Sequence, residues 1–436
     1  MPEALCVCAK GGWVRNFRLI AIFLAIALPA RAQVPASAQA WVQAVATGGY
    51  EARIITDGQT CPILKSDKGE VTMTVRAPEN GAFPLTCSAP IPGGATTASV
   101  NDVAMPLPAA RPDRILVLGD TGCRIKGGAL QACNDPAAWP FPTLAAAAAK
   151  LKPDLVVHVG DYLYREEPCP PGNTGCEGSP SGDNWPSWNA DFFAPAAPLL
   201  AAAPWVILRG NHEDCQRAGL GFLRLLGQDA FDPAAPCNPH LAPFTVSLGG
   251  VTLAAMDNAD APDTSIDDRL VPLYEKEFQD LAALPAPLWY AGHRPIWAAI
   301  SGPLNIPIGG NATIIAAASK TPLPPNIALM LSGHIHTFEA INYEGAVPPQ
   351  IVAGNGGDNL DITPANLKGA IFQGRSGVSV KDGLSVGGFG FLMMTRRDAD
   401  WTIDLYDSAG RQKGQCVFTP GADGGVGRVD CPDFKP

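Results

Sequence analysis

Five short hydrophobic runs in this chain each end in a glycine that is followed at once by aspartate, asparagine or histidine. The junctions are Gly119-Asp120, Gly160-Asp161, Gly210-Asn211, Gly292-His293 and Gly333-His334. Short runs rich in Val, Ile and Leu are typical of buried β-strands. In α/β folds, functional side chains gather beyond the carboxyl ends of strands, where glycine allows a sharp turn. The pattern therefore predicts one polar site assembled from five strand ends.

The segments around these junctions alternate between strand-like and helix-like patterns. We expect helices over 143–150 and 270–284 and a hairpin over 244–256 that turns at Gly249-Gly250. Strands are expected over 114–118, 154–159, 205–208, 288–291, 327–331, 350–353, 388–394 and 401–405. Alternation of this kind predicts an α/β fold.

The N-terminal part has a different character. Residues 33–110 contain strand-like runs over 52–55, 71–75 and 97–100, separated by turn residues, which predicts a small all-β module. The Pro-rich stretch 105–112 is a plausible linker, so we expect the main domain to span residues 111–436.

The first 32 residues have the features of a secretory signal. Basic residues precede the apolar segment 19–28, and Ala30-Arg31-Ala32 offers a small-x-small cleavage site. An uncleaved anchor is the alternative, but the apolar segment is short for a membrane span. We therefore expect a secreted or periplasmic protein with no membrane span after signal removal.

The cysteines agree with an oxidising compartment. Ten of the twelve cysteines lie beyond residue 32, and they fall into neighbouring pairs that would each close a short loop. The expected disulfides are Cys61–Cys87, Cys123–Cys133, Cys169–Cys176, Cys215–Cys237 and Cys416–Cys431.

The charge balance excludes some functions. The net charge is −10, and it becomes more negative when the basic first 32 residues are set aside. A protein that binds nucleic acid through its phosphates would be basic, so we expect no nucleic-acid-binding surface.

The histidine positions indicate metal chemistry. Four of the six histidines, at 212, 293, 334 and 336, follow the glycine junctions within three residues. His158 lies between valines and is expected in the core, and His240 is expected in a loop. Neutral imidazole is a common metal ligand, and His334 and His336 can point to one spot from a strand end.

Oxygen-bearing side chains complete this set. Asp120, Asp161, Asn211 and Tyr164 stand at or near the other junctions. Together with the imidazoles they can hold two adjacent metals that share a carboxylate, an arrangement suited to in-line displacement at phosphorus. Mixed oxygen and nitrogen ligands suit Fe, Zn or Mn better than Ca or Mg.

With these motifs the chain resembles the calcineurin-like metallophosphoesterases, and among them the purple acid phosphatases. That subfamily carries Asp-x-Gly in the first motif and a tyrosine in Gly-Asp-x-x-Tyr, and both occur here, as Asp120-Thr121-Gly122 and Asp161-Tyr162-Leu163-Tyr164. The resemblance covers roughly residues 114–360, with the motifs in family order. It implies a sandwich of two mixed β-sheets flanked by helices, preceded here by the small β-module.

The resemblance also implies roles for individual residues. The first metal, Fe(III), would be held by Asp120, Tyr164 and His336, with Asp161 as the bridge. The second, a divalent Zn, Mn or Fe ion, would be held by Asp161, Asn211, His293 and His334. His212 would contact phosphate or protonate the leaving oxygen, so His212 and Asp161 are the expected catalytic residues.

The function that the resemblance implies is a secreted acid-phosphatase-like enzyme that hydrolyses phosphate monoesters of small molecules by attack of a metal-bound hydroxide. A phosphodiesterase or nucleotidase with the same two metals is the alternative. An inactive binding protein of this fold is more remote, because it should lack a ligand and none is missing. Arg165, Glu213 and Arg294 are candidates for substrate contact, and the insertion 165–200 is a candidate specificity loop.

Overall fold

The computed structural model describes residues 39–375, 377–432 and 434, so the predicted signal segment lies outside the described residues. The strands of its largest sheet follow one another in space in this order: β27 (Arg428–Asp430), β26 (Gln412–Thr419), β25 (Asp400–Asp407), β24 (Gly390–Arg397), β9 (Arg114–Leu118), β12 (Leu155–His158), β13 (Trp205–Ile207), β1 (Gln39–Ala44), β2 (Tyr50–Thr56), β6 (Leu85–Pro90) and β5 (Thr74–Ala77). In its centre, β9, β12, β13 and β1 run parallel, and the flanking strands are antiparallel.

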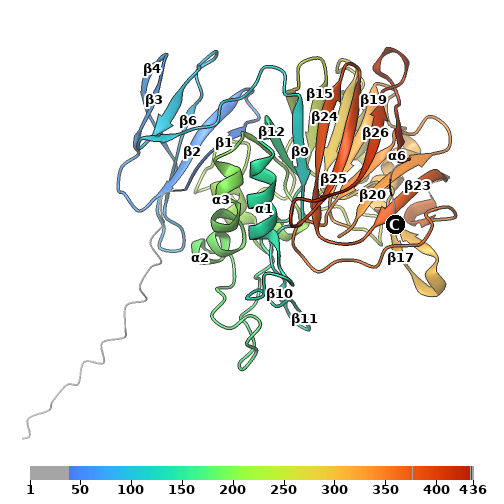
Figure 1. Ribbon diagram of the computed structural model, residues 1–436, viewed down its shortest axis with the longest axis horizontal. Helices are drawn as coiled ribbons and strands as arrows, with labels where there is room; N and C mark the ends of the chain where they lie inside the picture. Colours follow the sequence, from blue (N-terminus) through green and yellow to red (C-terminus); the bar gives the residue numbers. More distant parts are fainter. Residues whose placement is uncertain (1–38, 376, 433, 435–436) are drawn as a thin grey trace, which may run out of the picture. The chain divides into compact units, whose positions relative to one another are not determined.

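A second mixed sheet faces the first. Its order is β14 (Phe244–Ser247), β15 (Thr252–Met256), β16 (Leu288–Gly292), β19 (Ile327–Ser332), β21 (Gln350–Ala353), β20 (Phe338–Tyr343) and β23 (Val380–Val386). The core between the two sheets contains Val117, Val157, Leu253, Leu329 and Leu392, all at most 1% exposed. The two sheets therefore form a sandwich (Figure 1).

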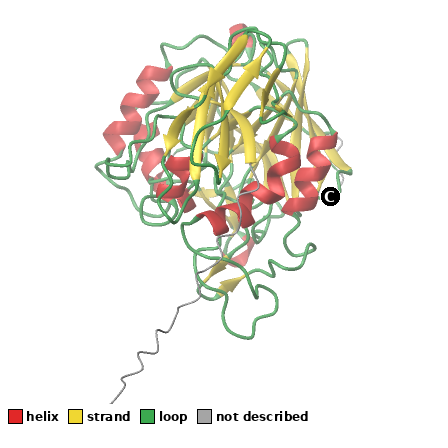
Figure 2. Cartoon of the chain, turned by 90° about the vertical axis from the view of Figure 1, so that its left-hand side faces the viewer, coloured by secondary structure: helices red, strands yellow, loops and turns green. Residues whose placement is uncertain are grey.

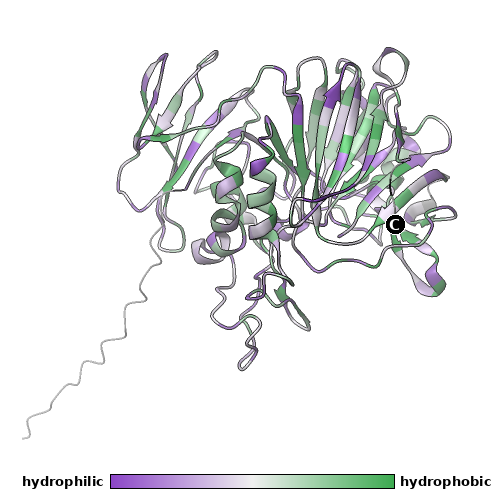
Figure 3. Ribbon diagram, viewed as in Figure 1, coloured by the Kyte–Doolittle hydropathy of each residue, from purple (hydrophilic) through white to green (hydrophobic). Residues whose placement is uncertain are grey.

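Helices cover the outer faces of this sandwich (Figure 2). The core on the outer side of the large sheet includes side chains of α1 (Phe141–Lys150), α2 (Trp185–Trp188), α3 (Ala194–Leu200) and α4 (Gly219–Leu225). The second sheet is covered by α5 (Val271–Leu281) and α6 (Ala312–Lys320). In α5, Val271, Tyr274, Phe278 and Leu281 form a buried stripe at helical spacing. Hydrophobic residues are frequent on the strands of both sheets and on α1 and α3 (Figure 3).

Among the described residues, three smaller sheets and five short helical turns complete the fold. The sheets consist of β4 (Gly69–Thr72), β3 (Ile63–Ser66), β7 (Ala98–Val100) and β8 (Val103–Ala104), of β10 (Ile125–Lys126) and β11 (Ala129–Leu130), and of β17 (Ala299–Ser301), β18 (Pro307–Gly309) and β22 (Ile371–Phe372). The turns are η1 (Asn189–Phe193), η2 (Asn211–Glu213), η3 (Pro303–Asn305), η4 (Gln373–Arg375) and η5 (Ala422–Gly424).

This architecture confirms the expected α/β class and the two-sheet sandwich. One strand prediction is wrong: residues 71–75 do not form one strand but belong to β4 and β5, which lie in different sheets. Between them, the backbone N–H of Met73 donates to the carbonyl of Pro62, and its side chain is buried, so the chain changes sheet there. All five expected disulfides are present.

The N-terminal strands are divided between two sheets. β1 pairs in parallel with β13, so β1, β2, β6 and β5 extend the large sheet, and only β3, β4, β7 and β8 stand apart. The proposed boundary near residue 110 therefore falls within a continuous sheet.

Side chains of these strands also form hydrogen bonds to the carboxyl end of α4. The guanidinium of Arg76 in β5 donates to the carbonyls of Leu223, Arg224, Gly227 and Asp229, at 2.7–3.0 Å. Gln43 and Arg53 donate to the carbonyls of Leu226 and Leu225. The last carbonyls of a helix have no partner within the helix, so these contacts satisfy them. The N-terminal strands thus fix the helix that follows the Asn211–His212 turn.

Replacing Arg76 with methionine is expected to destabilise the protein by about 2–4 kcal/mol, because buried carbonyls lose their donors. Lys65→Met is the matched control, since the Lys65 side chain is 53% exposed and should change stability by less than about 0.5 kcal/mol. Urea unfolding of both variants measures the difference. Equal stabilities would show that the Arg76 contacts do not hold α4.

Candidate metal centre

The five glycine junctions meet at one edge of the sandwich. Asp120 follows β9, Asp161 follows β12, Asn211 lies in the turn η2 after β13, and His293 and His334 follow β16 and β19. Because β9, β12 and β13 are parallel, as are β16 and β19, these residues lie at the carboxyl ends of neighbouring strands. The hairpin β10–β11, which follows β9, extends below the sheets in Figure 1.

The glycines are needed because the junction loops approach each other closely. A Cβ atom on Gly210 would lie 2.0 Å from Asp161 Oδ1, and one on Gly333 would lie 2.4 Å from Asp120 Oδ2. Asp120, Asp161 and His334 themselves have positive φ angles of 57°, 62° and 69°. Such backbone conformations are unusual for non-glycine residues and concentrate at functional sites.

The Tyr164 hydroxyl is the meeting point of one group of side chains. It lies 2.7 Å from Asp161 Oδ2, 3.2 Å from Asp120 Oδ1 and 3.1 Å from His336 Nε2. His336 Nε2 also lies 3.3 Å from Asp120 Oδ1. All four side chains are less than 10% exposed. The four groups that the sequence predicted around the first metal are therefore brought together.

A second group shares Asp161. One potential ligand atom each from Asp161, His293 and His334 lies within 4.8 Å of the others. Asn211 Oδ1 lies 3.0 Å from His293 Nε2, which is itself 3.3 Å from Asp161 Oδ2. The structure thus places the predicted ligands of the second metal beside the first group.

Contacts behind the imidazoles determine which ring nitrogen faces the cluster. His293 Nδ1 lies 2.8 Å from the carbonyl of Val159, and His336 Nδ1 lies 2.6 Å from that of Asn359. A carbonyl accepts a hydrogen bond, so Nδ1 carries the proton and Nε2 is left as a ligand. In His334 the two ring nitrogens have the opposite roles. Its Nε2 lies 2.9 Å from Asp263 Oδ2, so Nδ1 is left as the possible ligand.

The electrostatics of the cluster favour a bound cation. Burial and the carboxylates of Asp161 and Asp120 raise the pKa of Tyr164 well above its usual value. Burial alone would lower the pKa of His293 and His336, but neighbouring carboxylates, including Asp161 and Asp358, raise these pKa values to about 9 and about 10. Buried carboxylates that attract protons onto their neighbours also attract metal ions. The donor set of carboxylates, phenol, amide and imidazoles fits two metal ions of the Fe, Zn or Mn type.

His212 stands beside the cluster in a contact with Glu166 that the sequence motifs did not single out. Its Nδ1 lies 2.7 Å from Glu166 Oε1, and its ring lies 3.7 Å from the Tyr164 ring between centroids. The guanidinium of Arg217 contacts both Glu166 and His212. Glu166 stands two residues after Tyr164, and this short separation is the one feature of the sequence that could have pointed to it.

Two candidates for substrate contact are engaged elsewhere. Arg165 is 4% exposed and pairs with Asp191 at 2.6 Å. Glu213 is fully buried and accepts hydrogen bonds from the backbone N–H groups of residues 161, 162, 163 and 210. These contacts occupy both groups, so the geometry favours positioning roles over the substrate contact that the sequence suggested. Arg294 lies closer, with Nη1 3.1 Å from His334 Nε2 and in contact with Asp263.

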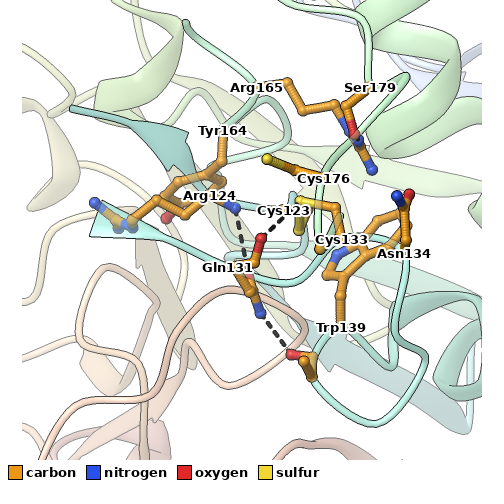
Figure 4. The surroundings of a disulfide bond; sticks show 12 residues. Cys123, Arg124, Gln131, Cys133, Asn134, Trp139, Tyr164, Arg165, Cys176 and Ser179 are labelled. Carbon is orange, nitrogen blue, oxygen red and sulfur yellow. Dashed lines mark hydrogen bonds between the residues drawn. A yellow bond between two sulfur atoms is a disulfide. The ribbon is translucent and has the colours of Figure 1, made fainter. Parts of the chain in front are cut away.

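The insertion 165–200 contacts the backbone next to Tyr164. Its second half forms α2, η1 and α3, and the Asp191 carboxylate in η1 accepts hydrogen bonds from the backbone N–H groups of Cys123, Tyr164 and Arg165. Figure 4 shows the Cys123–Cys133 disulfide next to Tyr164 and Arg124. Arg124 lies over the Tyr164 ring and pairs with Asp358, whose carboxylate is 3.5 Å from His336 Nδ1.

The two histidines outside the cluster have structural partners. His158 is buried, and its ring nitrogens lie near the Thr121 hydroxyl and the Gly160 N–H. His240 joins its loop to α5, with Nε2 2.8 Å from Glu277 and Nδ1 3.4 Å from Asp260. Burial alone would lower the pKa of His240, but these two carboxylates raise it to about 10.

This raised pKa predicts a pH-dependent stability. A group whose pKa is higher in the folded state stabilises the protein fully below its unfolded pKa of about 6.5 and loses that effect as pH rises through about 10. Burial also raises the pKa of Glu277, which acts in the same direction. Thermal unfolding should therefore show a fall in stability between pH 6.5 and 10 that is smaller in His240→Gln. Parallel pH profiles for the two proteins would contradict this role.

Comparison with known proteins assigns the class that the fold and the cluster indicate. A family model for calcineurin-like phosphoesterases matches residues 113–338, and the chain belongs to this family. It is therefore a metallophosphoesterase, of a family whose phosphoric ester hydrolases use a two-metal centre. No curated protein sequence matches the chain.

Solved structures with this fold include a purple acid phosphatase and PhoD. The purple acid phosphatase PPD1 from yellow lupin seeds matches with a TM-score of 0.54 and 13% identity, over 87% of this chain and 73% of its own. PhoD matches with a TM-score of 0.52 and 12% identity, over 92% of each chain. In the described part of the chain, no helix combines the length and apolar character needed to cross a membrane.

Proposed function

We propose that this protein is a secreted phosphatase that hydrolyses phosphate monoesters of small molecules at a site for Fe(III) and a divalent metal. The observation that carries the proposal is the convergence of Asp120, Asp161 and His336 on the Tyr164 hydroxyl. A phenol among carboxylates and an imidazole is suited to a hard, highly charged cation such as Fe(III). The five disulfides support an oxidising compartment.

Each metal ion would be held by its own set of site residues, with Asp161 common to both. Asp120, Tyr164 and His336 would hold Fe(III), Asn211, His293 and His334 would hold the divalent ion, and Asp161 would bridge them. When bound, such ions neutralise phosphoryl oxygens and make a water molecule more acidic. The carbonyls of Val159 and Asn359 keep Nε2 of His293 and His336 directed at the cluster.

His212 is placed to move a proton during the reaction. Its Nε2 lies 3.9 Å from Asp161 Oδ2, on the side of the cluster, while Glu166 holds Nδ1. A histidine oriented by a carboxylate can donate a proton to the leaving alcohol oxygen, which would otherwise depart as a poor, charged leaving group. Arg217 contacts both His212 and Glu166 and supports this arrangement.

The choice between monoesters and diesters is tested with p-nitrophenyl phosphate and its bis-ester. We expect the monoester to have the higher kcat/KM. A higher value for the bis-ester would favour the phosphodiesterase or nucleotidase alternative. Hydrolysis of neither ester by metal-loaded protein would favour the inactive binding protein.

The visible absorption spectrum tests the identity of the first metal. Wild-type protein is expected to show a broad band from a bond between Tyr164 and Fe(III), and Tyr164→Phe should lose it. Tyr162→Phe is the matched control, because the Tyr162 hydroxyl instead lies 2.9 Å from the carbonyl of Leu208. If the active, oxidised wild-type protein lacked this band, the first metal would be Zn or Mn rather than Fe(III).

A further inference from the structure

The described residues include an exposed hydrophobic surface beside the metal centre. It is built on the small sheet of β17, β18 and β22, and we define the apolar ridge as Leu304, Ile306, Ile362 and Ile371. These side chains are 92%, 40%, 75% and 59% exposed. Ile371 is paired with Ile308 in the sheet, and the carbonyl of Ile362 accepts a hydrogen bond from the N–H of Ser301.

Holding these side chains in water is costly. Leu304 and Asn305, at the tip of the β17–β18 hairpin, both have positive φ angles, 58° and 59°. This backbone region is disfavoured for leucine, and the exposed side chain gains no packing that would offset the strain. Residues 295–319 also contain no Asp, Glu, Lys or Arg. A strained, uncharged and exposed hairpin indicates a surface kept for binding.

The ridge is continuous with the predicted ligands. The carboxylate of Asp361 accepts a hydrogen bond from the N–H of His336 at 2.9 Å, and Ile362 is the next residue. At the base of the hairpin, Asn311 donates to Asp263, the carboxylate that contacts His334. In Figure 1 the hairpin that begins with β17 projects below the sheets, as β10 and β11 do. Ile362 and the base of the hairpin therefore adjoin residues that contact His336 and His334.

We propose that the apolar ridge binds the hydrocarbon part of the substrate, so that the preferred substrates are phosphate esters of alcohols with an alkyl chain. This inference rests on the proposed phosphatase function and adds the substrate class. The organic group of an ester must extend out of the cluster, because the cluster itself is buried. An alkyl chain gains free energy when it leaves water and packs on apolar side chains, whereas a sugar or a second phosphate gains nothing from such a contact.

The test compares n-butyl phosphate with n-octyl phosphate, and n-butylphosphonate with n-octylphosphonate as non-hydrolysable probes for calorimetry. We expect wild-type kcat/KM and phosphonate affinity to be about tenfold higher for the octyl compounds, because four further methylenes are partly removed from water. In the double variant Leu304→Ser, Ile362→Ser this preference should fall to about twofold. Inhibition by inorganic phosphate should stay unchanged. Val103→Ser is the matched control, since Val103 is 57% exposed on β8, in a sheet that holds no predicted ligand.

Equal affinity of wild-type protein for the two phosphonates would overturn the inference. So would an octyl preference that survives in the double variant, because the chain would then bind elsewhere. Binding to phosphatidylcholine vesicles that requires Leu304 and Ile362, without an octyl preference, would assign the ridge to a bilayer and also overturn it. If no ester is hydrolysed but octylphosphonate binding depends on the ridge, the phosphatase proposal fails while the hydrocarbon site stands.

Discussion

Replacing Asp161 with asparagine is expected to abolish nearly all phosphatase activity and to lower the bound metal. Asp161 is the one carboxylate shared by both groups, since its Oδ2 lies 2.7 Å from the Tyr164 hydroxyl and 3.3 Å from His293 Nε2. An amide is neutral and its oxygen is a weaker ligand than a carboxylate oxygen, so it should not hold two cations together. The loss should exceed the roughly 100-fold effect typical of substitutions behind metal ligands.

Activity toward p-nitrophenyl phosphate and elemental analysis of the same sample measure both effects. Asp102→Asn is the control, because the Asp102 side chain is 93% exposed and pairs with Lys65 across 3.8 Å, away from the cluster. Asp161→Asn protein that kept two metals and full activity would show that Asp161 does not bridge them.

Replacing His212 with alanine is expected to lower kcat by about 10²–10⁴ while leaving the bound metal unchanged, because His212 supplies a proton rather than a ligand. The size of the effect should depend on the leaving group. An alkyl alcohol leaves poorly without a proton, whereas p-nitrophenolate leaves well, so the loss should be larger for an alkyl phosphate.

The companion variant Glu166→Gln tests how His212 is oriented. An amide oxygen can still accept from Nδ1, but the charge that stabilises a protonated imidazole is lost, so an intermediate effect of about 10–100-fold is expected. Equal losses for both kinds of ester in His212→Ala, or loss of metal from that variant, would contradict the proton-donor role. Full activity of His212→Ala would contradict it as well.

Much of the site could be predicted because the information is local. A hydrophobic run followed by glycine and a polar residue specifies a strand end, and parallel strands then bring Asp120, Asp161 and Asn211 together without knowledge of the loops. The same reasoning paired neighbouring cysteines correctly. The sequence predictions also identified β9 and β21 with their observed bounds, and the hairpin over 244–256 that contains β14 and β15.

The partners of these residues were harder to predict because they come from distant segments. Asp263 contacts His334 across 71 positions of sequence, and Asp358 pairs with Arg124 across 234. No motif surrounds either aspartate. Glu213 and Arg165 lie next to predicted site residues, but their side chains point to the backbone N–H groups and to Asp191. Sequence adjacency to a ligand therefore did not predict exposure to substrate.

The extent of the large sheet was also hidden in the sequence. β1 pairs with β13 over a separation that no local pattern reveals, and its residues gave no strand signal beyond a few apolar positions. The buried polar residues Gln43, Arg53 and Arg76 look unsuitable for a core until the carboxyl end of α4 supplies carbonyl partners. Tertiary contacts, rather than propensity, decide these positions.

The central claim is that one buried cluster holds two metal ions around Asp161. Elemental analysis of the purified protein, by metal ions per chain, tests it most directly. The predicted result is two ions per chain, at least one of them iron, with a lower number in Asp161→Asn. Wild-type protein that hydrolyses phosphate esters fully after exhaustive chelation, with no metal bound, would contradict the account.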